Sequence, residues 1–315
     1  DGSSALSGAA APVFIEERKA DGTLVSTIAL PTAASGSNQP FTMAGTATSE
    51  GGLALSASGR YLTAAGYATA PGTAAVAATT TATVFRAVAR LDAAGNVDTA
   101  TSFSTAESGT NARAAVSADG SGVWLAGAAD VWYGLFGAAT QSGTAVLTAP
   151  ANVRWLGIFG GQLYGSSGSG AFTNVFTIGT GLPVTVGQTA TSLPGMPTSG
   201  ASPYGFVLFD LDPDVAGNDT LYVADDAAGL QKWTFDGLTW TEAATLSLAA
   251  PIGFRGVAGF AADGTVTLMA STAETGVDRL VVFADAGGTV APVGTVVATA
   301  TVNTAFRGLA LSPHP

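Results

Sequence analysis

Four arginines recur in one local pattern, in which the basic residue is followed by small and apolar residues. They are Arg113, Arg154, Arg255 and Arg307, and Tyr204 takes the same place in a fifth segment. Guanidinium groups that converge bind carboxylates or phosphates through paired hydrogen bonds. If the segments surround one channel, the five side chains are predicted to bind an anion, such as an acidic glycan, at the mouth of that channel. The alternative is that they donate hydrogen bonds to carbonyl groups of neighbouring units and fix the spacing between the units.

A second candidate site is an acidic segment with carboxylates at every other position. Asp210, Asp212 and Asp214 alternate, and Asp219 follows five residues later. Oxygen ligands at this spacing can converge on Ca²⁺, the one cofactor that the sequence suggests. The segment lacks the glycine directly after the third aspartate and the distal glutamate of an EF-hand. The alternative is a solvated turn in which the aspartates accept hydrogen bonds from backbone donors.

Groups for catalysis are scarce. His314 is the only histidine and lies next to the end of the chain, and there is no cysteine. Serine–histidine triads, multi-histidine metal sites and thiolate chemistry are therefore excluded. Glu50, Glu107, Glu242 and Glu274 are scattered, and nothing selects two of them as the carboxylate pair of a glycoside hydrolase. We name no catalytic residue and expect a non-catalytic protein.

The charge balance argues against nucleic acid and membranes as partners. The 315 residues carry a net charge of −11, and only 10% are charged. A nucleic-acid-binding surface normally carries a basic stripe, and an anionic membrane attracts one as well. No apolar run reaches the roughly 18 residues of a membrane span. The abundance of Ala, Gly, Ser and Thr favours a secreted or cell-surface protein whose signal peptide, if any, has been removed. Asn218 begins the one glycosylation sequon, a weak signal.

The arginine-bearing segments are part of an internal repeat. A sixth segment, 51–56, matches the last one with Gly51 in the arginine place, and the spacings between anchors run from 41 to 62 residues. Six units of about 52 residues would use up the chain.

The fourth unit predicts four strands, at 204–211, 220–224, 230–235 and 239–248, bounded by Gly, Asp and Asn. No segment shows a long helical period. We therefore predict an all-β fold: a single domain over 1–315, a six-bladed β-propeller of four-stranded antiparallel blades. A pair of β-sandwiches or a β-helix would not explain this spacing.

The two ends of the chain are predicted to share the closing blade, built from about 1–32 and 303–315. Segment 306–312 would be its innermost strand, and 12–19 and 23–30 its outer strands. Only residues 1–10 remain for the second strand, and their Ser/Gly/Ala-rich sequence has poor β-propensity. We expect this blade to lack one ordered strand or to be completed by another chain.

Two stretches carry a resemblance to known families. Residues 219–226 (DTLYVADD) together with 229–233 (GLQKW) resemble blades of NHL- and YVTN-type propellers. Residues 11–31 resemble a group of uncharacterised secreted bacterial β-propeller proteins. The resemblance implies a propeller fold and an extracellular setting, and it implies no catalytic residues.

These observations favour a secreted, non-catalytic β-propeller. It would be a structural or binding module at the cell surface, including a subunit of an extracellular assembly or filament, with other chains or copies of itself as partners. The alternative is a carbohydrate-active propeller, a lectin or a polysaccharide-degrading enzyme, that binds acidic sugars at the arginine-bearing mouth. An enzyme should gather an acid pair and arginine around one cleft, whereas an assembly subunit should expose a large apolar patch.

Overall fold

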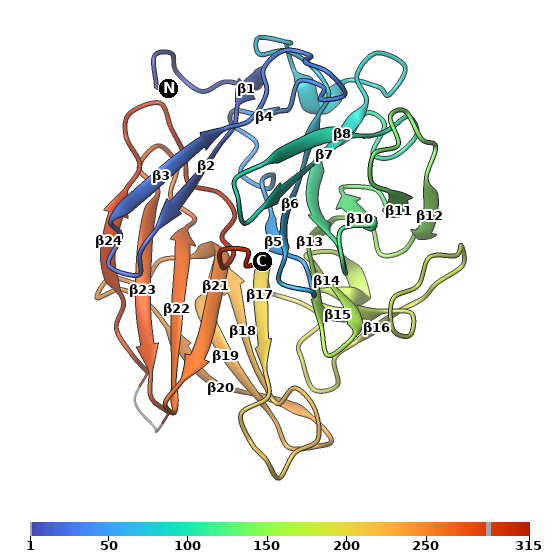
Figure 1. Ribbon diagram of the computed structural model, residues 1–315. Helices are drawn as coiled ribbons and strands as arrows, with labels where there is room; N and C mark the ends of the chain where they lie inside the picture. The colour runs from blue at the N-terminus through green and yellow to red at the C-terminus, as the bar shows by residue number, and fades with distance from the viewer. Residues whose placement is uncertain (1, 288–290) are drawn as a thin grey trace.

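The computed structural model describes residues 2–287 and 291–315, and its regular structure is almost entirely β (Figure 1). Within these residues the helical elements are two single 3₁₀ turns, Val76–Ala78 and Gly170–Phe172. The all-β prediction is confirmed. In the part of the chain that is described, no helix has the length and apolar character to cross a membrane.

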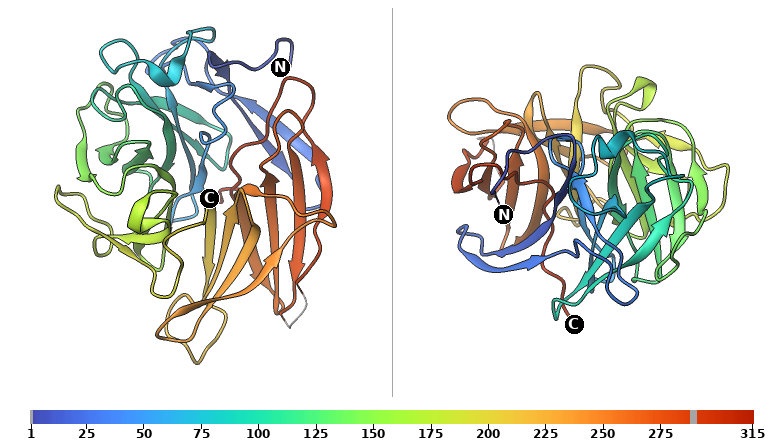
Figure 2. Two further views of the ribbon diagram at one scale, coloured as in Figure 1. Left: turned by 180° about the vertical axis from the view of Figure 1, so that it is seen from behind. Right: turned by 90° about the horizontal axis from the view of Figure 1, so that it is seen from above.

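Five sheets are arranged around a common centre (Figure 1), and the view from behind in Figure 2 shows the same ring. The first runs in the order β1-β4-β6-β7-β8, with β5 also paired to β6. Its strands are β1 (Ala10–Pro12), β4 (Thr42–Ala44), β5 (Leu53–Leu55), β6 (Tyr61–Tyr67), β7 (Arg86–Asp92) and β8 (Val97–Phe103).

The other four sheets are four-stranded antiparallel meanders, each made from consecutive strands. The second comprises β9 (Ala112–Val116), β10 (Gly122–Gly127), β11 (Val131–Leu135) and β12 (Thr144–Leu147). The third comprises β13 (Val153–Phe159), β14 (Gln162–Ser167), β15 (Asn174–Ile178) and β16 (Ala190–Ser192). The fourth comprises β17 (Pro203–Phe209), β18 (Thr220–Asp225), β19 (Gly229–Phe235) and β20 (Trp240–Leu246). The fifth comprises β21 (Phe254–Ala262), β22 (Thr265–Thr272), β23 (Arg279–Asp285) and β24 (Thr295–Thr299).

Large apolar side chains fill the space between neighbouring sheets. Trp124 lies in a cluster shared by the second and third sheets, and Trp155, Trp233 and Trp240 lie in one shared by the third and fourth. All four are at most 7% exposed. Most of the tryptophans therefore stabilise the packing of sheet against sheet, which is the dominant apolar contribution in such a fold.

The innermost segments of the sheets approach one another at glycines in equivalent positions. A Cβ atom on Gly205 would lie 2.8 Å from the carbonyl oxygen of Arg255, and one on Gly256 would lie 2.6 Å from that of Arg307. Gly308 meets the backbone of Gly51 in the same way, and its N–H donates to the Gly51 carbonyl at 2.9 Å. The repeated segments thus lie side by side around the centre of the ring.

The predicted number of blades is wrong: the structure has five blades and not six. β2 (Phe14–Arg18) and β3 (Leu24–Ala29) form a separate two-stranded sheet, and 303–315 contains no assigned strand. Segment 306–312 lies beside Gly51 at the centre, yet it pairs with no strand (Figure 1). We call β2, β3 and residues 303–315 the closing sector.

The missing blade has a physical reason in the N-terminal segment. Residues 2–10 do not run between segment 306–312 and β2. Instead β1 pairs with β4, and the carbonyls of Ser7 and Ala9 accept hydrogen bonds from Thr46 and Gly45. Residue 1 lies outside the described residues. Without a second strand, no strand pairing among the described residues joins the innermost segment to the hairpin.

Substitution of Gly308 by alanine tests the close approach of the inner segments. The new Cβ would overlap the backbone of Gly51 and Leu53, which cannot move aside as a flexible side chain could. We expect Gly308→Ala to lower the free energy of unfolding by about 1–3 kcal/mol, measured by urea denaturation. Gly8→Ala is the matched control, because no atom lies within 4 Å of that added Cβ. Equal stability of the two variants would contradict the packing.

Candidate functional site

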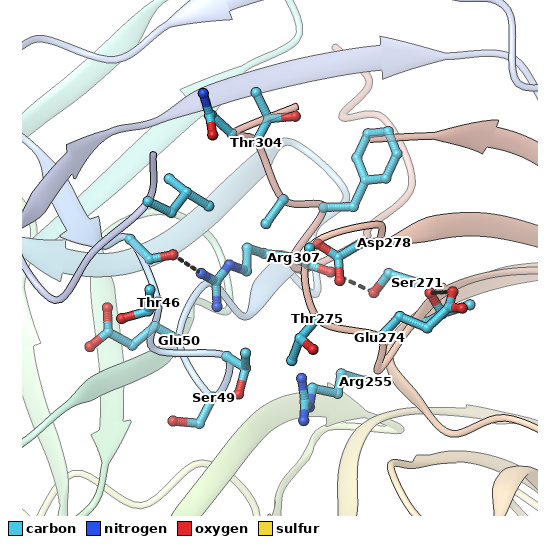
Figure 3. A pocket seen from close by; sticks show the side chains of 18 of the residues that line it. Thr46, Ser49, Glu50, Arg255, Ser271, Glu274, Thr275, Asp278, Thr304 and Arg307 are labelled. Carbon is cyan, nitrogen blue, oxygen red and sulfur yellow. Dashed lines mark hydrogen bonds between the residues drawn. The ribbon is translucent and has the colours of Figure 1, made fainter. Parts of the chain in front are cut away.

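A cavity of about 420 Å³ opens at one end of the ring (Figure 3). Its wall consists of residues 5–6, most of residues 45–50, the end of β22 with the β22–β23 loop, and residues 302–307, together with three side chains from inner strands. We call it the mouth cavity. Charged and aromatic side chains line it: Glu50, Arg255, Glu274, Asp278, Arg307, Trp155, Tyr204 and Phe306.

Arg307 projects from the C-terminal segment and is held by the first sheet. Its two terminal nitrogens donate to the carbonyl oxygens of Gly45, at 2.7 Å, and Ala47. The Ser271 hydroxyl donates in turn to the Arg307 carbonyl at 2.7 Å. Burial lowers the pKa of the Arg307 guanidinium, and the nearby carboxylates of Glu50 and Asp278 oppose this. Each terminal nitrogen of Arg307 therefore already donates one hydrogen bond within the protein.

Tyr204 lies between two guanidinium groups. The Arg154 guanidinium carbon is 4.4 Å from the Tyr204 ring centroid, and that of Arg255 is 5.3 Å from it. Arg154 also donates to the Ser202 hydroxyl at 2.8 Å, and Arg255 pairs with Asp226 at 3.2 Å. The Nε atom of Arg255 is buried and, in the described structure, has no hydrogen-bond partner.

Arg113 lies away from the cavity wall. Its guanidinium donates to the side chain of Asn152 and to the carbonyl of Val153 in the third sheet, and burial lowers its pKa. Of the five predicted anion-binding residues, the structure therefore brings Tyr204, Arg255 and Arg307 to the mouth cavity. Arg113, Arg154 and Arg307 contact carbonyls of the next unit, as the spacing interpretation predicts.

Glu50 is the most tightly held acid of the cavity wall. It is 3% exposed. It accepts hydrogen bonds from the Ala44 amide at 2.8 Å, the Tyr67 hydroxyl at 2.5 Å and the Asn111 amide group at 2.6 Å. Burial raises its pKa, and the three hydrogen bonds oppose that rise. Glu50 thus joins the first sheet to the start of the second.

Asp278 differs from the other two carboxylates of the cavity. Glu274 is fixed by Arg279 through contacts of 2.6 and 2.9 Å. Asp278 is 6% exposed, and among the described residues its carboxylate accepts a hydrogen bond from its own backbone amide and from no other residue. Burial raises its pKa, while Arg307 and Arg255 lower it. Figure 3 shows Asp278 close to Arg307, on the wall opposite Glu50.

Sequence reasoning did not select Asp278, and it regarded Glu50 and Glu274 as scattered. The fold brings the three acids to one cavity, although more than 200 residues separate Glu50 from Glu274. The sequence did contain one sign that Glu50 lies near the channel: it directly precedes Gly51, the first residue of repeat segment 51–56. Asp278 directly precedes β23, and no repeat pattern marks that position.

The predicted calcium ligands lie in the loop between β17 and β18. Asp210, Asp212 and Asp214 are exposed, and Asp219 is buried. One oxygen of Asp219 accepts the amides of Leu211 and Asp212, at 2.8 and 2.9 Å. These are the hydrogen bonds of the solvated-turn interpretation.

Nowhere in residues 2–287 and 291–315 do three or more His, Asp or Glu side chains form a group that could hold a metal ion. Calcium binding stays an untested prediction. So does glycosylation at the half-exposed Asn218.

Comparison with known proteins adds little to this description. No family model and no curated protein matches the chain. Thirty-six solved chains match. One is the extracellular domain of a putative hybrid two-component system from B. thetaiotaomicron, with 10% identity and a TM-score of 0.43 over 91% of this chain. The chain spans about a third (33%) of that protein's length. This likeness assigns no ligand or activity, and an NHL or YVTN type stays a prediction.

The buried Glu50 predicts a specific pH dependence of stability. The pKa of Glu50 is higher in the folded protein than its ordinary value of 4.5. In the pH window between these two values, Glu50 keeps its proton in the folded protein and has released it in the unfolded chain. The Glu50 contribution to the free energy of unfolding is therefore full below this window and falls as the pH rises through it.

Glu50→Gln removes this titration. We expect it to cost about 1–3 kcal/mol at a pH near 4 and less at neutral pH, measured by urea denaturation at both. Glu242→Gln is the control, because Glu242 is exposed on β20. A cost that does not change with pH would contradict the role given to Glu50.

Proposed function

We propose that the protein is a non-catalytic binding module of the extracellular space, and that the mouth cavity binds a small hydroxyl-rich ligand such as a neutral saccharide. The observation that carries the proposal is the carboxylate of Asp278 in the cavity wall, which among the described residues accepts a hydrogen bond only from its own backbone amide. A buried carboxylate with unused acceptor positions costs stability, so a ligand that donates to it is favoured. Saccharide hydroxyls are suitable donors.

The other groups of the cavity support a saccharide. Trp155, Tyr204 and Phe306 supply apolar ring surface, and Arg255 supplies a guanidinium group in the wall. Pockets that combine apolar walls with a few placed polar groups are typical small-molecule sites. The three carboxyl groups outnumber the two guanidiniums, and each terminal nitrogen of Arg307 already donates one hydrogen bond. This balance favours a neutral sugar over the acidic sugar suggested by the arginine pattern.

A binding role is favoured over hydrolysis for a related reason. Glycoside hydrolases commonly need two carboxyl groups that can act on opposite sides of one bond. In the cavity, Glu50 holds three hydrogen bonds and Glu274 is fixed by Arg279. Of the three acids, only Asp278 has no side-chain partner among the described residues. A single carboxylate can accept hydrogen bonds from a ligand, but it lacks the second carboxyl group that hydrolysis needs.

Secretion and a place at the cell surface belong to the same proposal. They rest on the composition, with 10% charged residues and an abundance of Ala, Gly, Ser and Thr, and on the resemblance to secreted propellers. A structural role in an extracellular assembly is the second candidate function. It is favoured by the closing sector and the adjoining residues 291–302, which hold seven of the fourteen large apolar residues exposed in the described chain.

The saccharide proposal is tested with Asp278→Asn. Trp155 lines the cavity, so neutral and uronic oligosaccharides can be titrated by tryptophan fluorescence. We expect saturable binding of a neutral oligosaccharide and at least a roughly tenfold weaker Kd for the variant, since hydrogen bonds to a charged group contribute about 1.5–3 kcal/mol. Asp214→Asn, in an exposed loop, should bind like the wild type.

The same variant separates function from folding. Burial raises the pKa of Asp278, so its ionised form costs stability at neutral pH, and the cost disappears as the pH falls below its ordinary value of 3.8. Asp278→Asn should therefore raise the melting temperature at pH 7 while it weakens binding. A variant that loses stability, or a wild type that binds no neutral saccharide, would count against the proposal. Preferential binding of uronic acids would restore the acidic-glycan alternative.

A further inference from the structure

The backbone of the closing sector has hydrogen-bonding groups without partners. Gly308 donates to Gly51, and the Arg307 carbonyl accepts from Ser271. From Leu309 to Ser312, however, no amide or carbonyl forms a hydrogen bond with any described residue. Leu309 and Ala310 are half-buried. Backbone groups in such places are normally paired, and an unpaired strand edge is a template for another strand.

The equivalent residues in three other sheets show what this edge lacks. Gly52, Gly205, Gly256 and Gly308 make the same close contact with the next inner segment, which aligns the segments residue by residue. Two positions later, Ala54 pairs with Thr63 on β6, Val207 with Tyr222 on β18, and Ala258 with Met269 on β22. Ala310 is the fourth member of this set, and it has no partner.

The hairpin on the other side of this edge is also unpaired. β2 and β3 pair only with each other, and the Arg18 guanidinium lies 5.4 Å from the ring centroid of Phe306. Phe14, Leu24 and Val25 on the hairpin are 41%, 47% and 52% exposed, and Leu311 on the inner segment is 40% exposed. Leu24 and Val25 are adjacent on β3 and point to opposite faces, so the hairpin exposes apolar side chains on both of its faces.

We propose that the closing sector binds one extended β-strand of a second polypeptide chain, which pairs with residues 309–312 as a second strand pairs with the inner strand of a blade. The described segments of this chain have other places. Residues 7–10 in particular are bonded to Gly45, Thr46, Thr73 and Val76. This inference does not rest on the saccharide site: the strand would pair with residues 309–312, which do not line the mouth cavity, although residues 303–307 belong to both regions.

The chemistry of the strand follows from the second strands already present. β10 and β18 are buried at every residue and are mostly apolar on both faces. The occupant is therefore a strand of about six residues, apolar on both faces, antiparallel to 306–312. Main-chain hydrogen bonds would supply affinity, and the apolar side chains would supply specificity, as in other cases of strand addition.

The test uses a labelled synthetic peptide with the sequence of residues 219–226, which contains β18. We expect saturable, one-to-one binding by fluorescence anisotropy, and a rise of several degrees in Tm when the peptide is at 100 times its Kd. A peptide with proline in place of Val223 lacks one strand N–H and should bind at least about tenfold more weakly. Asp278→Asn protein should bind the peptide normally.

Register is tested by cross-linking, since the chain has no cysteine of its own. The alignment places Ala310 opposite the position of Tyr222 in the peptide. Ala310→Cys protein should form a disulfide with the Tyr222→Cys peptide at least about tenfold faster than Leu238→Cys protein does. Leu238 is the control position because it is 76% exposed and lies in a distant turn. No saturable binding, equal binding of the proline peptide, or equal cross-linking at Leu238 would overturn the proposal.

Discussion

The close approach of backbone to backbone at the centre of the ring is the constraint on which the rest of the structure depends. At Gly205, Gly256 and Gly308 an added Cβ would overlap a carbonyl of the next segment. Because side chains are excluded at these points, the chain must return to the centre with glycine or another small residue once per unit. This requirement explains the repeated anchor pattern in the sequence. The large side chains that pack sheet against sheet lie farther from the centre of the ring.

The same constraint places polar side chains at one end of the ring. The residue before each of these glycines projects beyond the tight contact, and there Tyr204, Arg255 and Arg307 reach the mouth cavity. Most of their polar atoms are used to hold one unit to the next, through carbonyls, Asp226 and stacking on Tyr204. Among the described residues, the Nε of Arg255 has no hydrogen-bond partner, and the Asp278 carboxylate is bonded only by its own backbone amide. Groups left unpaired in a buried place lower stability, and such costs are commonly retained where a ligand binds.

The closing sector shows how far the constraint alone can organise the chain. Gly308 is seated against Gly51 as its counterparts are, so close packing positions the C-terminal segment without any sheet. A blade needs more than this contact: a second strand must carry hydrogen bonds from the inner segment to the hairpin. Residues 2–10 are too poor in β-forming side chains to serve, and they bond to the first sheet instead. The result is five blades, with a hairpin and an inner segment left without strand partners.

The sequence by itself determined the all-β class, the repeat and the strands of the fourth unit, whose predicted boundaries fall within two residues of β17–β20. These features depend on local alternation, turn residues and glycine, which are visible without a fold. The hairpin of β2 and β3 was foreseen for the same reason. The number of blades was not, because it depends on whether a weak segment finds a better partner elsewhere, which is a competition between distant contacts.

The site was decided by the tertiary structure. Arginines in one register are visible in the sequence, but the carbonyls and carboxylates that occupy their donors come from other units. Glu50, Glu274 and Asp278 come from distant parts of the chain, and only the closure of the ring brings them to one cavity. Whether a carboxylate is satisfied or free depends on the geometry of its neighbours, which residue spacing does not contain.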